Sequence, residues 1–206
     1  RAIMPRLIPA FQRQYPNVEI MLRECSNDAI QKALLSGGID LAIAAYPKAP
    51  PSIELADYYT EHTVLCLVDS LLVQCQIDLD VRRNEIAAGD LHSLRDCPFV
   101  LGSAADIGGR IGRELLRASG ISPISKATSE NVETLLALCV QGVGACFCPE
   151  NLLQTALSPE QLAQLHVLPL CPSASYPICF GYLRRSYPWS VLSEFIRIAR
   201  EQIRSA

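Results

Sequence analysis

Cysteine is the residue type in this sequence with the widest chemical reach. The chain has nine cysteines, at positions 25, 66, 75, 97, 139, 146, 148, 171 and 179, and three histidines. Most of the cysteines stand in apolar runs such as ALCVQGVGACFCP, where a free thiol packs as a small hydrophobic side chain. The odd number of cysteines and the absence of a signal-peptide pattern disfavour a secreted protein held together by disulfides. We therefore expect the protein to be located in the reducing cytoplasm.

Two cysteine pairs stand out by their spacing. Cys146 and Cys148 are two residues apart, which places both side chains on one face of a strand. Cys66 and Cys75 are a candidate redox couple, although no basic residue beside either one favours a lowered thiol pKa. The scattered histidines do not combine with the cysteines into a zinc-binding spacing, so we expect no metal and no cofactor.

The sequence contains no recognisable catalytic constellation. Glu130 and Glu133 are candidates for acid/base work, but no nucleophile or metal ligand stands beside them. The segment SAADIGGRIGRE has neither a phosphate-loop pattern nor the G-x-G-x-x-G of dinucleotide-binding folds. We therefore expect a binding protein and not an enzyme.

Three polar loops carry the candidate binding residues. Each loop follows an expected strand and opens a helix, so its unpaired backbone N–H groups suit a carboxylate or another small anion. Beside this reading stands the simpler one, in which Ser26 and Ser129 serve only as helix N-caps. The predicted ligand-binding residues in these loops are Ser26, Asn27, Gly102, Ser103, Ser129 and Asn131.

Two further side chains are candidates for the same site. Arg110 follows the second loop and is a candidate partner for an anion, although most helical arginines are simply solvated. Phe147 is predicted to form an apolar wall of the site, and packing in the core is the alternative for this ring.

The elements that position these loops alternate between strand and helix, which favours a mostly parallel sheet covered on both faces. A helix over 5–15 is followed by an alternating strand over 18–23. The run SNDAIQKALLSGGIDLAIAA then predicts a helix, a stop at Gly37 and Gly38 with positive φ, and a buried strand over 39–45.

Later elements follow the same pattern. A short helical turn is expected over 92–94, and the rest of the segment from 69 to 97 gives no clear pattern. The other predicted strands span 53–59, 63–68, 98–102, 126–129, 145–148, 167–171 and 178–184, and the other helices span 107–118, 131–141 and 189–203.

Composition narrows the class of protein. At 206 residues and 50% hydrophobic content, the chain can fill one large or two small domains. A net charge of −3 and a pI near 5.6 give no support for a nucleic-acid surface. No apolar run is long enough to span a membrane.

Taken in order, five pieces of the sequence resemble the effector-binding domain of LysR-type transcriptional regulators. They are PRLIPAFQRQYPNVEIML, LLSGGIDLAIA, RDCPFVLGSAADIGGRIGRELLRASGISP, SENVETLLALCVQGVGACFCPENLL and SVLSEFIRIAR. No single piece is specific, but their order and spacing cover nearly the whole chain. The segment 69–97 departs from the family, since the usual His-Pro pair is absent.

The resemblance implies an α/β fold of the type 2 periplasmic-binding-protein-like class, with two Rossmann-like subdomains joined by two crossover strands. Subdomain I would comprise residues 1–68 and 171–206, and subdomain II residues 69–170. Ser26, Asn27, Ser103 and Ser129 correspond to loops that line the effector cleft between them.

The resemblance also implies partners. We expect a small-molecule effector. We also expect a winged helix-turn-helix upstream of this chain, and contact with DNA only through that segment. Self-association is expected as a dimer, or as a tetramer in the full-length protein, through the PRLIPAFQ helix and the VEIML strand. The first sheet strand of the family precedes that helix and is expected to lie upstream as well.

Other readings of the same pattern stay open. A redox-sensing member of the family requires two cysteines within disulfide range, with Cα atoms closer than ~7 Å. A solute-binding protein would share the fold but would tolerate free thiols poorly. An enzyme of this architecture would need a catalytic lysine or a cofactor-bearing cysteine, and Lys32, Lys48 and Lys126 lie in no convincing pocket motif.

Overall fold

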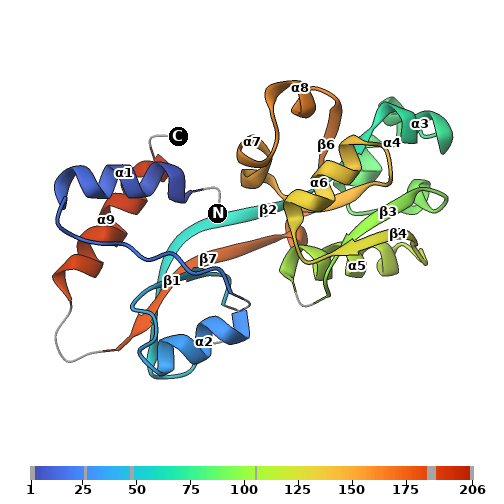
Figure 1. Cartoon of the computed structure of the whole chain (residues 1–206). Helices are drawn as coiled ribbons and strands as arrows, with labels where there is room; N and C mark the ends of the chain where they lie inside the picture. Colours follow the sequence, from blue (N-terminus) through green and yellow to red (C-terminus); the bar gives the residue numbers. More distant parts are fainter. Residues whose placement is uncertain (1–2, 26, 47–48, 105, 185–188, 205–206) are drawn as a thin grey trace. The chain divides into compact units, whose positions relative to one another are not determined.

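The chain folds into two compact units (Figure 1). The computed structural model describes residues 3–25, 27–46, 49–104, 106–184 and 189–204. Unit 1 is discontinuous and comprises Arg1–Thr60 and Tyr176–Ala206, whereas unit 2 is the single stretch Glu61–Ser175. Two strands, β2 (Ile53–Val68) and β7 (Ser175–Leu183), carry the chain from one unit to the other.

Unit 1 is built on a small antiparallel sheet. The strand β1 (Ala42–Ala44) pairs with β7, with Ala42 opposite Gly181, and β7 lies next to the first part of β2. Among its described residues, this unit has the helices α1 (Met4–Gln14), α2 (Asn27–Leu35) and α9 (Ser190–Arg204).

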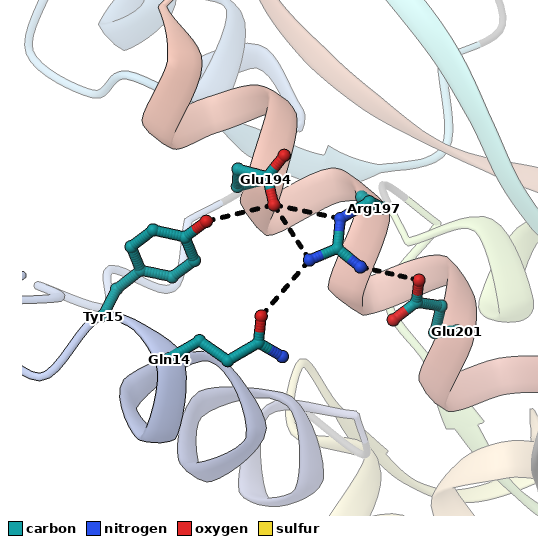
Figure 2. A network of polar contacts seen from close by, with 5 residues as sticks. All are labelled: Gln14, Tyr15, Glu194, Arg197 and Glu201. Atoms are coloured by element: carbon teal, nitrogen blue, oxygen red, sulfur yellow. Dashed lines mark hydrogen bonds and ion pairs between the residues drawn. The ribbon is translucent and has the colours of Figure 1, made fainter.

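The helices α1 and α9 share one hydrophobic cluster and a polar network. Apolar residues at helical spacing on α1 pack against α9 and the sheet; the buried members are Leu7, Ala10, Phe11, Phe180, Ile196, Ile198 and Ala199. Figure 2 shows the polar network at the end of α1, where Glu194 accepts hydrogen bonds from Tyr15 at 3.1 Å and from Arg197 at 2.9 Å. Arg197 also reaches Gln14 and Glu201, so a single guanidinium joins both helices.

Unit 2 contains a mixed set of strands. The second half of β2 is flanked by β5 (Cys146–Pro149) and β6 (Leu165–Pro169), both antiparallel to it. The strands β3 (Pro98–Gly102) and β4 (Ile124–Ser129) run parallel to each other. The helices are α3 (Asp69–Gln74), α4 (Leu79–Ala87), α5 (Ile107–Ala118), α6 (Val132–Val140), α7 (Leu153–Ala156) and α8 (Pro159–Leu162), with 3-10 turns at His92–Leu94, Glu150–Leu152 and Pro172–Ala174.

The core of unit 2 surrounds β3. All five residues of this PFVLG strand are buried, which agrees with its continuous apolar sequence. Gly144 makes this packing possible, because a Cβ at that position would lie 2.7 Å from the carbonyl carbon of Phe99. The backbone of Ala145 can therefore pair directly with Pro98 and Val100.

Many predicted elements are confirmed. The helices α1, α5, α6 and α9 and the strand β3 lie within a few residues of the predicted ranges, and the 92–94 turn is present. Gly37 ends α2 with φ of +71°, but Gly38 does not take a positive φ, so that part of the prediction is wrong. None of the described helices is both long and apolar enough to cross a bilayer.

The predicted strand over 18–23 is wrong. The segment is irregular, and Met21 and Leu22 are 80% and 56% exposed. Alternating hydrophobicity favours an extended backbone, but a strand also needs a neighbour to accept and donate its backbone hydrogen bonds. Within the described part of the chain, no strand forms a ladder with this segment.

The expectation of a mostly parallel sheet is also wrong. The parallel ladder is β3 with β4, whereas the pairs β1–β7, β2–β5 and β2–β6 are antiparallel. The two strands expected over 53–68 form one strand, β2, because its middle remains extended around the buried Glu61. The sequence reading also missed the short helices α3, α4, α7 and α8.

Candidate ligand-binding site

The ends of β3 and β4 bring two of the predicted loops together in unit 2. These strands are parallel neighbours, and Gly102 is the register partner of Ser129. The loops that follow them, 102–103 and 128–131, therefore start side by side at the carboxyl edge of the pair. This edge is where α/β folds place ligands, since helices begin there.

A close backbone approach fixes the first loop. A Cβ at Gly109, in the first turn of α5, would lie 2.8 Å from the carbonyl carbon of Gly102, so only glycine fits there. Asp106 caps the helix by accepting from the backbone N–H of Gly109 at 3.1 Å. The carbonyl of Ser103 accepts from the N–H of Asp106 at 3.1 Å and closes the turn.

The second loop is fixed by Asn131 and not by Ser129. The Asn131 side chain accepts from the backbone N–H groups of Glu133 and Thr134, at 2.8 and 3.3 Å, and so caps α6. The hydroxyl of Ser129 instead accepts from the backbone N–H of Asn131 at 3.0 Å. The reading of Ser129 as the N-cap of this helix is wrong, and its half-buried hydroxyl still has a proton to donate.

Arg113 is a site residue that the sequence reading missed. Its Nη2 donates to the carbonyl oxygen of Gly102 at 2.8 Å, and its buried Nε has no hydrogen-bond partner in the described part of the protein. Gly109 and Arg113 are four residues apart and share the helix face toward the end of β3. The sequence signal that could have identified Arg113 is a glycine at the start of a predicted helix, Gly109, followed four residues later by an arginine.

The other two candidate side chains have different surroundings. Arg110 is more than half exposed and forms an ion pair with Glu114 at 4.0 Å. Phe147 is only 4% exposed and packs in the core, parallel to Phe99 with ring centroids 6.0 Å apart. The Phe147 side chain therefore has almost no exposed surface with which to contact a ligand.

The predicted loop of unit 1 is only partly described. Ser26 lies outside the described residues. The helix α2 begins at Asn27, as the capping pattern predicts to within a residue.

Most thiols of unit 2 gather in two groups. Cys66 lies against Cys148, with sulfur atoms 3.6 Å apart, whereas the thiol of Cys75 neighbours Cys97. The predicted couple of Cys66 with Cys75 is therefore wrong, because each sulfur contacts a different partner. Within the described ranges, no three His, Cys, Asp or Glu side chains are arranged to hold a metal ion.

Chemically, the edge formed by β3 and β4 offers hydroxyl and backbone donors beside one guanidinium. Ser103 and Ser129 are half-buried, and Arg113 donates a hydrogen bond to the carbonyl oxygen of Gly102, the residue before Ser103. Donors and positive charge of this kind suit a carboxylate or a similar small anion.

The sequence comparisons agree on one family. A family model described as the LysR substrate binding domain matches residues 1–204. The HTH-type transcriptional activator IlvY of Salmonella typhimurium is 26% identical over 157 residues, which are 76% of this chain and 50% of the relative. The chain thus spans about half the length of the curated relatives that it matches.

The structural comparisons agree on the fold. The effector-binding domain of BenM with its effector benzoate has a TM-score of 0.75 at 20% identity, covering 98% of this chain and 86% of that one. The effector-binding domain of QuiR in complex with shikimate has a TM-score of 0.70 at 17% identity, covering 98% and 90%. These likenesses confirm the predicted α/β, periplasmic-binding-protein-like fold class.

Proposed function

This chain belongs to the family of LysR substrate-binding domains, and from that premise we propose that it binds a small organic anion as the sensing part of a longer transcriptional regulator. The curated relatives are transcriptional regulators, and the stretch that matches this chain is half of their length. Their role favours regulation over solute transport and over catalysis. DNA would be bound by another segment of the full-length protein, in the cytoplasm.

The observation that carries this proposal is the register of β3 and β4. It aligns Gly102 with Ser129, so that two helix-opening loops and the Arg113 guanidinium share one edge of unit 2. BenM and QuiR are named with benzoate and shikimate, and both ligands are small carboxylates. The donors at this edge are the groups that a carboxylate requires.

Sensing requires that the ligand favour one arrangement of the domain over another. A ligand shifts a conformational equilibrium only by its difference in affinity for the two states. We propose that the anion stabilises one packing of the loops after β3 and β4, and that attached DNA-binding segments respond to it.

A ligand titration tests the site. We expect a panel of small carboxylates to contain one that raises the melting temperature, since ligands that bind only the native state stabilise it. Ser129→Ala and Ser103→Ala should each weaken that ligand by ~10–100-fold, the equivalent of one hydrogen bond to a charged group. Calorimetric titration measures the change.

Ser125→Ala is the matched control. Ser125 lies on the same strand β4, but its exposed hydroxyl is directed to the carbonyl of Ala127. Equal weakening by this variant, or a panel without any stabilising carboxylate, would contradict the proposed site. Asn27→Ala in the same titration tests the contact predicted for unit 1.

We also propose self-association through unit 1. Met21 and Leu22 are large apolar side chains that are mostly exposed, and they follow α1 in the predicted dimer segment. Met21→Asp should lower the dimer fraction in sedimentation by at least severalfold, because a buried unpaired charge is costly. Val73→Asp is the control, since Val73 is 79% exposed in unit 2; dimers unaffected by Met21→Asp would refute this interface.

A further inference from the structure

A cluster of thiols lies inside unit 2, apart from the proposed ligand loops. Cys66 on β2 is the register partner of Cys146 on β5, and the sulfur of Cys66 lies 3.6 Å from that of Cys148. Cys139 on α6 donates to the carbonyl of Cys66 at 3.2 Å. These cysteines are all 0% exposed.

The protonation of the cluster is uneven. The hydrogen bond with Cys146 lowers the pKa of the Cys66 thiol, but Cys148 and burial outweigh it and raise that pKa well above the usual 9.0. Hydrogen bonds with Cys139, Cys148 and Cys66 raise the pKa of Cys146 in the same way. Hydrogen bonds from Cys146 and from Cys66 act in the opposite direction on Cys148 and lower its pKa to about 5. Within this group, Cys148 is therefore the thiol that loses its proton more readily than Cys66 or Cys146.

We propose that Cys66 and Cys148 are a dithiol site that a small peroxide converts into an intramolecular disulfide. Their sulfur atoms are in van der Waals contact, so a bond of ~2.05 Å requires a shift of ~1.5 Å between them. The inference rests on this geometry and is independent of the ligand-binding function.

The reaction consumes one hydrogen peroxide. The Cys148 thiolate attacks one peroxide oxygen, the O–O bond breaks, and the departing hydroxide takes a proton to leave as water, which gives a sulfenic acid at Cys148. The Cys66 sulfur then attacks the Cys148 sulfur, and the hydroxyl leaves as a second water with the Cys66 proton. Two electrons pass from the thiols to the peroxide, and an S–S bond forms.

Burial restricts the oxidant. Because both sulfurs are fully buried among side chains such as Val64 and Leu136, a bulky charged disulfide such as oxidised glutathione has no direct access. Hydrogen peroxide is small and uncharged. Cys25, which is exposed, should instead react with either oxidant.

Mass spectrometry of the native chain tests the site. The reduced chain is treated with hydrogen peroxide or with oxidised glutathione, unfolded, and alkylated. With peroxide we expect a peptide that joins Cys66 to Cys148, lighter by two hydrogen atoms than its two reduced parts, with neither of these cysteines alkylated. Oxidised glutathione should not produce this peptide.

Variants separate the pair from its neighbours. Cys66→Ser and Cys148→Ser should each abolish the mass loss, whereas Cys179→Ser, a buried cysteine of unit 1, should retain it. Circular dichroism checks that each variant is folded, and Cys66→Ala replaces Cys66→Ser if the hydroxyl unfolds the protein. No mass loss in the native chain, a loss that persists in a folded Cys66 variant, or linkage of Cys66 to Cys146 would overturn the proposal.

Discussion

At the scale of single residues, glycine decides how closely α5 approaches the strands of unit 2. Gly109 lets the first turn of the helix reach the Gly102 carbonyl, and Gly112 receives the ring of Phe147. A Cβ at Gly112 would lie 2.6 Å from Cγ of Phe147. The position of Arg113, and with it the hydrogen bond to the site loop, depends on this packing.

Gly112→Ala should therefore destabilise the protein. Overpacking of a well-packed core costs about 1–3 kcal/mol, and the Phe147 ring is buried on a strand and has little room to move. Urea unfolding measures the change in free energy. Gly38→Ala is the control, since a Cβ there would meet nothing nearer than 3.5 Å; equal stability of Gly112→Ala and the native chain would contradict the packing.

At the scale of elements, the ends of α1 and α9 are joined by the network in Figure 2. The hydrogen bond from Arg197, followed by the one from Tyr15, lowers the pKa of Glu194 below its usual 4.5. A carboxyl group whose pKa is lower in the folded state than in the unfolded state stabilises the folded protein at pH values above its unfolded-state pKa. This stabilisation is lost as pH falls through the folded pKa.

Glu194→Gln should accordingly lower the melting temperature at pH 7, and the difference from the native chain should shrink below pH 4. Melting curves across this range measure it. Glu19→Gln, which removes an exposed carboxylate between α1 and α2, should have little effect at either pH. A Glu194→Gln deficit that stays constant with pH would show that its charge is not what stabilises the helix pair.

At the scale of the whole molecule, the two units differ in how the chain builds them. Unit 2 is one continuous stretch with its own buried clusters around Phe99 and around Cys66. Unit 1 needs both ends of the chain, since α1 near the start packs with α9 near the end. Folding of unit 1 therefore requires the two segments on either side of unit 2 to meet, which closes a loop that contains all of residues 61–175.

A fragment of residues 61–175 should fold on its own. Its strands β2, β5 and β6 pair with one another, and β3 pairs with β4, all within this range. We expect a cooperative thermal transition by circular dichroism and dispersed amide signals by NMR. The fragment 1–60 is the control and should be unfolded alone; an unfolded 61–175 fragment would show that unit 2 depends on unit 1.

The sequence by itself determined the local elements. Capping residues, glycine stops and helical spacing located α1, α5, α6 and α9, because these signals act between residues a few positions apart. The same signals placed the polar loops at strand ends. They failed at 18–23, where the pattern was that of a strand but strand formation depends on a neighbour elsewhere in the chain.

Only the tertiary structure decided which residues meet. The register of β3 with β4 places Gly102 beside Ser129, and the close packing of α5 against these strands brings Arg113 to the Gly102 carbonyl. The pairing of β2 with β5 sets Cys66 against Cys148 and not Cys75. Each of these contacts joins segments far apart in the sequence. They depend on the packing of buried side chains around β3, for which the order of residues along one segment carries no direct signal.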